Sequence, residues 1–544
     1  MYIRPSLDSR AKFALTGLTA VLIFAALTAW ALSSPVGSSP DEDFHLTSSW
    51  CGHGARDGVC EDGPSSATRT VPAALLTASC FAFRPNVSAS CQGAGFAPGT
   101  SQMTVTGRGN FTNSYPPAFY FAMSFFVGND ISRSVIAMRL ANAALFVLLV
   151  TALYLALPGV LRRPLLWGTA VSIVPLGMFL IPSVNPSGWA ISSAATLLVS
   201  TVGYLTTNGR RRIVLAALAF VSVVLGAGSR GDAALYSVAA LAGALLVSYR
   251  RERRFVRVSL YPVALGVFAL VSYLRVGQAD VATAGLGSQP DLEFSLGKVA
   301  RLIMTVPDLW VGALGKWGLG WLDTYLPPVV WVTASAIFFG TVFAALGKLD
   351  RRRGFVLAVY GIAIWVIPVY VLYLSGAIVG ETVQARYILP LLVLFAGAAM
   401  LPVRGVPFAL SAGQRWLTVV GLAGANSVAL YDNIRRYVNG ADAPSLNLNT
   451  GVKWWWGIPI SPDAVWLIGT IAFAGGLALL SLALRPPVAV RVNGLGEGFA
   501  AVLVPDGRDP SEWDGEAPGN KSIGGRAPAS LAPVKGEGVE QSDG

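Results

Sequence analysis

Three acidic residues and a histidine follow one another shortly after the first long apolar run of the chain. They are Asp41, Glu42, Asp43 and His45. A carboxylate can accept the proton of an attacking hydroxyl group, and a carboxylate with a histidine can bind a divalent cation. The alternative is a solvated start of a loop, which is the ordinary role of an acidic triplet. Asp41 and Glu42 are therefore candidate catalytic bases, and His45 is a candidate metal ligand.

A second polar group stands at the mouth of a later apolar run and contains Gln384, Arg386 and Tyr387. A guanidinium group matches the geometry of a phosphate, and the amide and phenol would add neutral hydrogen bonds. An arginine at such a position can also simply extend to the membrane interface. We take these three residues as candidates for binding a phosphate group.

Four further polar residues lie between apolar runs. Arg230 is a possible helper for Arg386, although Arg230 and Asp232 could simply pair with each other. Asn185 is first a turn signal, and Asp323 is first a candidate helix cap. Lining a polar cavity is the second role that we consider for three of these residues, Asn185, Asp232 and Asp323.

The composition requires a membrane to position these groups. Of 544 residues, 53% are hydrophobic and 13% are charged, whereas soluble proteins carry about 25% charged residues. The apolar residues form runs of roughly 17–25, the length that crosses a hydrocarbon layer. Helices satisfy their own backbone hydrogen bonds in lipid. The expected fold class is an all-α polytopic membrane protein.

Short basic clusters between the apolar runs set the expected topology. The net charge of +11 is therefore topological and does not predict binding to nucleic acid, because Lys and Arg mark cytoplasmic loops. We expect the protein in the cell inner (plasma) membrane with both termini cytoplasmic. Every basic cluster then lies on the cytoplasmic side. Twelve spans, with an uncertainty of one or two, are predicted at residues 12–33, 131–156, 164–182, 188–206, 212–228, 233–248, 256–274, 327–346, 355–376, 387–402, 416–431 and 464–484.

Four regions follow from this topology. Residues 1–33 hold the N-terminus and the first span, which is too long for the apolar region of a signal peptide. Residues 34–130 form an extracytoplasmic loop with an interfacial helix near 115–127. Residues 131–485 form the helical domain, with an outer loop at 275–326. Residues 486–544 are a disordered cytoplasmic tail rich in Gly, Pro and acidic residues.

All four cysteines lie in the first outer loop: Cys51, Cys60, Cys80 and Cys91. An even set in an oxidising compartment predicts two disulfides. Three pairings are possible, of which Cys51–Cys60 with Cys80–Cys91 is the simplest. A metal site is the weaker alternative because no C-x-x-C spacing occurs.

The chain shows no nucleotide-binding motif such as a P-loop or a Rossmann glycine pattern. It does resemble a bacterial family of multi-pass membrane proteins catalogued as domain-of-unknown-function family 2142. The resemblance spans about residues 39–390 and rests on four ordered motifs: Ser39-Pro40-Asp41-Glu42-Asp43-Phe44-His45, Asn185-Pro186, Gly320-Trp321-Leu322-Asp323, and Gln384-Ala385-Arg386-Tyr387-Ile388-Leu389-Pro390.

That family looks like the C-type glycosyltransferases, which use polyprenyl-phosphate-linked sugars. The resemblance implies that Asp41 or Glu42 is the general base on the acceptor hydroxyl. Arg386, helped by Arg230, would stabilise the departing lipid phosphate, and His45 would orient a carboxylate or bind a divalent cation. The implied partners are a polyprenyl-phosphate sugar donor, an envelope glycan or lipid acceptor, and membrane lipids.

Two other functions stay open. A transporter or flippase for a lipid-linked glycan would need ionisable residues in mid-span and inverted repeats, and the predicted spans are poor in such residues. A non-catalytic partner in envelope assembly would use the outer loop for docking.

Overall fold

Helices make up most of the part of the chain that the structure describes. The computed structural model describes residues 9–96, 102–281, 285, 295–380 and 383–484. Within them the chain forms one unit, Leu7–Pro486. The predicted tail at 486–544 lies outside the described residues.

Eight of the described helices are long and apolar enough to cross a membrane. They are α1 (Ser9–Leu32), α5 (Ile131–Ala156), α8 (Ser187–Thr206), α10 (Gly231–Ser248), α11 (Arg253–Leu274), α15 (Pro328–Leu346), α16 (Arg351–Leu374) and α19 (Pro462–Ala483). Each coincides with a predicted span, so the prediction of a polytopic helical membrane protein is confirmed.

Helices also occupy the other four predicted spans. They are α6 (Gly159–Ile173) with α7 (Leu176–Leu180), α9 (Gly209–Ala227), α17 (Ala385–Ala399) and α18 (Ala412–Val438). α17 has only 15 residues, α9 begins with three arginines, and the predicted span at 164–182 is interrupted between α6 and α7. The count of twelve spans stays a prediction.

Packing of small residues holds the centre of this unit together. Every residue from Ser187 to Leu205 of α8 is buried, and α8 contacts α9, α10 and α17. α6 and α17 approach so closely that a Cβ on Gly168 would lie 3.0 Å from the Cα of Gly397. Such small-residue contacts are how membrane helices approach one another. α17, which carries Arg386, is therefore firmly fixed.

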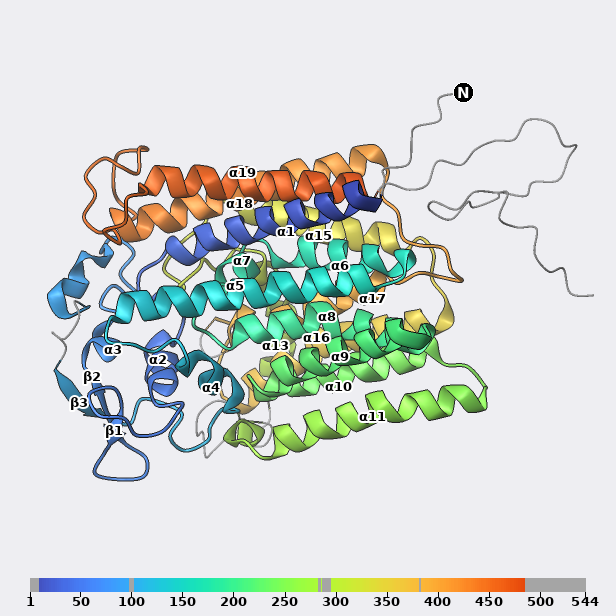
Figure 1. Cartoon of the computed structure of the whole chain (residues 1–544), viewed down its shortest axis with the longest axis horizontal. Coiled ribbons are helices and arrows are strands. Elements are labelled where there is room, and N and C mark those ends of the chain that lie inside the picture. Colours follow the sequence, from blue (N-terminus) through green and yellow to red (C-terminus); the bar gives the residue numbers. More distant parts are fainter. Residues whose placement is uncertain (1–8, 97–101, 282–284, 286–294, 381–382, 485–544) are drawn as a thin grey trace, which may run out of the picture. The chain divides into compact units, whose positions relative to one another are not determined.

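The segment between α1 and α5 gathers at one end of the helices, at the left in Figure 1. It comprises α2 (Glu42–Trp50), β1 (Glu61–Asp62), β2 (Arg69–Pro72), α3 (Ala74–Thr77), the 3-10 segment η1 (Ala89–Phe96), β3 (Met103–Thr106) and α4 (Ala118–Ser124). The strands form an antiparallel sheet in the order β1-β2-β3, with Thr70 opposite Val105. The start of α1 and the end of α19 lie at the opposite end (Figure 1).

Two disulfides crosslink this segment between α1 and α5. Cys51 bonds to Cys60 and Cys80 bonds to Cys91, so the simplest of the three pairings is found. Within the stretch 115–127, predicted to hold an interfacial helix, the structure has the short helix α4, with Phe121 51% and the following Phe125 67% exposed. Its place at a membrane interface stays a prediction. The predicted outer loop at 275–326 contains η2 (Gly277–Asp280), α13 (Leu296–Thr305) and α14 (Pro307–Ala313).

Candidate functional site

Asp41 lies at the junction between α1 and α2 and has a left-handed backbone, with φ +58°. Asp adopts this conformation more readily than most residues. Its side chain does not cap α2; each carboxylate oxygen instead accepts from a different guanidinium group. Arg386 Nη2 lies 2.6 Å from Oδ2, and Arg108 Nη2 lies 3.2 Å from Oδ1. Asp41 keeps 38% of its side chain exposed.

The carbonyl group of Pro40 fixes the position of Asp41. It accepts a hydrogen bond from Arg386 Nη1 at 3.0 Å and another from Asn185 Nδ2 at 2.8 Å. Asn185 lies just before α8 and Arg386 lies in the first turn of α17. Side chains at the starts of two buried helices therefore hydrogen-bond to Pro40. The structure therefore brings three residues of separate sequence motifs into one place.

Arg230 joins the same cluster from the start of α10. Its guanidinium forms two hydrogen bonds with Asp232, at 2.8 and 2.7 Å, as the simpler alternative for these residues predicted. It also lies 4.7 Å from the ring centre of Tyr387, and Arg386 lies 5.1 Å from the same ring. Arg386 Nη2 donates to the Tyr387 hydroxyl at 3.2 Å. Two arginines thus share one tyrosine beside Asp41.

Gln384 is the residue before α17. Its side-chain Oε1 is buried and has no hydrogen-bond partner among the described residues. A buried acceptor without a partner is costly, so this amide is able to accept a hydrogen bond from a ligand's hydroxyl group. It stands two residues before Arg386 in the chain, and its role in binding a phosphate group stays a prediction.

Electrostatics keep the Asp41 carboxylate ionised. Burial alone would raise its pKa, but the charge and hydrogen bond of Arg386, with a further contribution from Arg108, lower the pKa to about 2. At neutral pH the group is a carboxylate locked in two ion pairs. Its pKa would rise, and it would become a better proton acceptor, if Arg386 turned to another anion.

His45 is buried among aromatic rings. Its Nδ1 lies 3.0 Å from the Tyr120 hydroxyl, and its ring packs against Phe44 and Tyr115. Burial, together with the nearby arginines, lowers its pKa to about 3, so it is neutral at physiological pH. No group of three or more His, Cys, Asp or Glu side chains suited to a metal ion occurs in the described part of the chain. These residues do not fit the predicted divalent-cation site.

Glu42 occupies a different environment from its neighbour Asp41. It is fully buried and pairs with Arg139 of α5 at 3.1 Å. Arg139 also donates to the carbonyl oxygens of Ala31 and Ser34, and Glu42 Oε2 accepts from the Ser39 backbone N–H. This ion pair holds the chain between α1 and α2 in place and leaves Glu42 closed to a ligand.

Asp323 is engaged by a partner that does not contact Asp41. It is buried and pairs with Arg436 of α18 at 2.8 Å, and it does not cap α15, which begins at Pro328. The tight turn before it requires glycine, since Gly320 has φ +61° and a Cβ there would lie 2.6 Å from the Tyr437 hydroxyl. Asp323 is therefore part of the framework.

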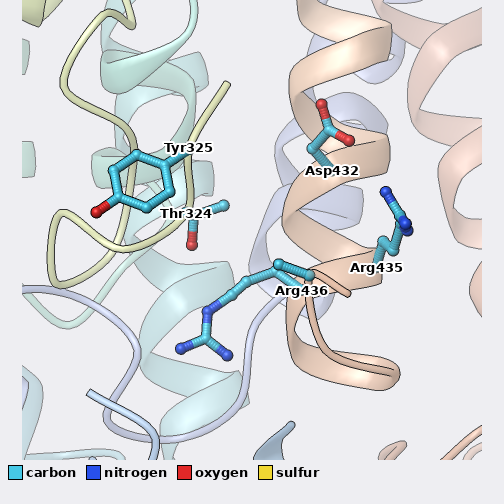
Figure 2. A pocket seen from close by; sticks show the side chains of 6 residues that line it. Thr324, Tyr325, Asp432, Arg435 and Arg436 are labelled. Carbon is cyan, nitrogen blue, oxygen red and sulfur yellow. The ribbon is translucent and has the colours of Figure 1, made fainter. Parts of the chain in front are cut away.

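Arg436 borders a small pocket beside this turn, with a volume of about 80 Å³. Figure 2 shows Arg436 reaching away from Asp432 and Arg435 on the same helix, with Thr324 and Tyr325 on the facing segment. Arg436 also donates to the carbonyl oxygens of Phe81 and Val87 in the Cys80–Cys91 loop. The Arg436 guanidinium at this pocket is therefore already hydrogen-bonded to other groups of the protein.

Two arginines of the site region escaped the sequence analysis. Arg139 had a usable signal, because a charged residue inside an apolar run is costly unless it is paired. Arg108 had none, since it lies in an irregular turn after β3 and its nearness to Asp41 depends on the three-stranded sheet.

Comparison with known proteins identifies a family. A family model described as "Predicted membrane protein (DUF2142)" matches residues 24–395, a range that includes Asp41, Asn185, Arg230 and Arg386. No curated protein and no solved structure matches the chain.

Proposed function

The chain belongs to the DUF2142 family of predicted membrane proteins, and from this premise we propose that it is a membrane glycosyltransferase. It would move a sugar from a polyprenyl-phosphate donor to an envelope glycan or lipid acceptor on the extracytoplasmic face. The observation that carries the proposal is the partly exposed Asp41 carboxylate, paired with Arg386 beside Arg230 and Tyr387. A base and a phosphate-binding cation are thus in direct contact.

The proposed reaction uses this contact directly. The donor phosphate binds Arg386 and Arg230 and draws Arg386 away from Asp41, which raises the pKa of Asp41. The acceptor hydroxyl oxygen attacks the anomeric carbon while Asp41 takes the hydroxyl proton. The bond from that carbon to the phosphate oxygen breaks, and the lipid phosphate leaves with the electron pair. The guanidinium groups stabilise the charge that grows on it.

Asp41 is the better candidate for the base than Glu42. Glu42 is 0% exposed and its carboxylate is engaged by Arg139 and the Ser39 N–H. Asp41 faces solvent in part, and its side chain makes no hydrogen bond that caps α2. We therefore assign the catalytic role to Asp41 and a positioning role to Glu42.

The test compares Asp41→Asn with Asp43→Asn in purified full-length protein offered a panel of polyprenyl-phosphate sugars. Both changes remove one negative charge next to Arg108, but only Asp41 contacts Arg386. We expect Asp41→Asn to lower transfer at least about 100-fold and Asp43→Asn to keep most of it. Equal transfer by both variants at equal protein levels would remove Asp41 from the mechanism.

The same variants separate transfer from transport. A flippase for a lipid-linked glycan needs cations for the phosphate but no base at the sugar. If vesicles containing Asp41→Asn protein move the lipid as fast as wild type, and neither protein transfers sugar, transport is the better description.

A further inference from the structure

Arg108 bridges two carboxylates beside the candidate site. Its Nη2 lies 3.2 Å from Asp41 Oδ1, while its Nε and Nη2 lie 2.8 and 3.1 Å from the two oxygens of Asp43. Two aspartates that face one another across such a gap are the usual hard oxygen ligands of Mg²⁺ or Mn²⁺. Here the gap contains a guanidinium group, whose N–H donors point to three of the four oxygens.

The turn that carries Arg108 is built onto α2. The Arg108 carbonyl accepts from the Thr47 hydroxyl, and the Asn110 backbone N–H donates to Ser48 Oγ at 2.8 Å. The guanidinium also lies 5.6 Å from the ring centre of Phe44. Although the Arg108 side chain is 46% exposed, its backbone is tied to α2 at its own carbonyl and again at Asn110.

Charges around the site balance without a metal ion. Arg386, Arg230 and Arg108 face Asp41, Asp232 and Asp43 in four ion-pair contacts. A divalent cation between Asp41 and Asp43 would have to expel Arg108, and His45 is turned to Tyr120 instead. Each carboxylate of the site already has a cationic partner.

We propose that Arg108 takes the place of a divalent cation between Asp41 and Asp43, so that this site works with a built-in cation. Arg108 is then a positioning residue: it holds both carboxylates together and keeps metal ions out. That the Arg108 guanidinium serves in sugar transfer rests on the proposed function. That it keeps metal ions from Asp41 and Asp43 does not depend on that function.

Mn²⁺ binding to the purified full-length protein tests the proposal without any transfer assay. Electron paramagnetic resonance reports free Mn²⁺ during titration of wild type, Arg108→Gln, Arg108→Lys and Arg108→Gln/Asp43→Asn. We expect Arg108→Gln to bind one Mn²⁺ at least about tenfold more tightly than the others. Arg69→Gln is the matched control, because Arg69 pairs with the exposed Asp62 in the same outer segment and its removal frees only one carboxylate.

Two results would overturn the proposal. The first is tight Mn²⁺ binding by wild type that Asp43→Asn abolishes. The second is Arg108→Gln binding Mn²⁺ no more tightly than Arg69→Gln, since Arg108 would then not be what excludes the ion. If transfer is established, wild type should keep its rate in a chelator; a lack of transfer would count against the proposed function alone.

Discussion

Asp41 and Arg386 are separated by 345 positions in the sequence, yet Arg386 Nη2 lies 2.6 Å from Asp41 Oδ2. The same guanidinium donates to the Pro40 carbonyl through its other terminal nitrogen. The Arg386 side chain thus fixes the position of the Pro40 carbonyl and keeps the Asp41 carboxylate ionised.

This double contact predicts that lysine cannot replace Arg386. An ammonium group keeps the charge but lacks the planar fork that reaches two acceptors. We expect Arg386→Lys to lower sugar transfer about 100-fold or more and Arg386→Gln to lower it further, measured at matched protein levels. Arg301→Lys on the exposed face of α13 serves as control. Full transfer by Arg386→Lys would show that charge alone is sufficient.

The buried pair of Arg139 and Glu42 predicts a loss of stability instead. Arg139→Met would leave the Glu42 carboxylate buried and unpaired, and breaking such a pair costs about 3–5 kcal/mol. Arg133→Met is the control on the same helix, since Arg133 is 88% exposed and its pair with Asp130 should contribute less than about 1 kcal/mol. Unfolding in detergent measures both; equal stability of the two variants would contradict the assignment.

The sequence predicts the membrane class and the approximate positions of the long apolar helices, but not α13, α14, the break between α6 and α7 or the full extent of α18. Of the residues around Asp41, it singles out Asn185, Arg230, Arg386 and Tyr387. It cannot tell which of Asp41 and Glu42 is available to a ligand. That difference depends on the left-handed backbone of Asp41, which turns the two side chains in different directions. It cannot find Arg108 either, since a turn has no periodicity. The number of spans is equally open, because α9 and α17 are near the limits of charge and length.

His45 predicts a specific pH dependence of stability. Its folded-state pKa of about 3 lies below the ordinary value of 6.5, so the unfolded chain takes up the proton first. The contribution of His45 is complete above about pH 6.5 and falls as the pH decreases toward 3. Between about pH 7.5 and pH 5, His45→Gln should lose less thermal stability than wild type.

The other histidine provides the control for this pH series. His53 lies at the exposed surface, in contact with Phe121 and Phe125, so His53→Gln tests whether removing any histidine of this segment produces the same change. Parallel curves for wild type and His45→Gln would show that His45 is not the group that becomes protonated on unfolding.

The loop between Cys80 and Cys91 is held twice, by its disulfide and by Arg436. Replacing both cysteines by serine raises the conformational entropy of the unfolded chain and should lower the free energy of unfolding by about 3 kcal/mol. Hydrogen exchange should increase at residues 81–90 while the amides of α17 stay protected. Faster exchange at α17 as well would mean that the disulfide also stabilises the helix that carries Arg386, and would contradict a purely local role for it.

The distance in sequence between Asp41 and Arg386 also orders events during synthesis. The ribosome adds about 5–20 residues per second, so Asp41 leaves it about 20 to 70 s before Arg386. Asn185 arrives earlier and can already grip Pro40, but the carboxylate lacks its strongest partner until α17 inserts. A nascent chain that stops before α17 therefore carries Asp41 without Arg386, and the complete pair forms while α18 and α19 are still to be made.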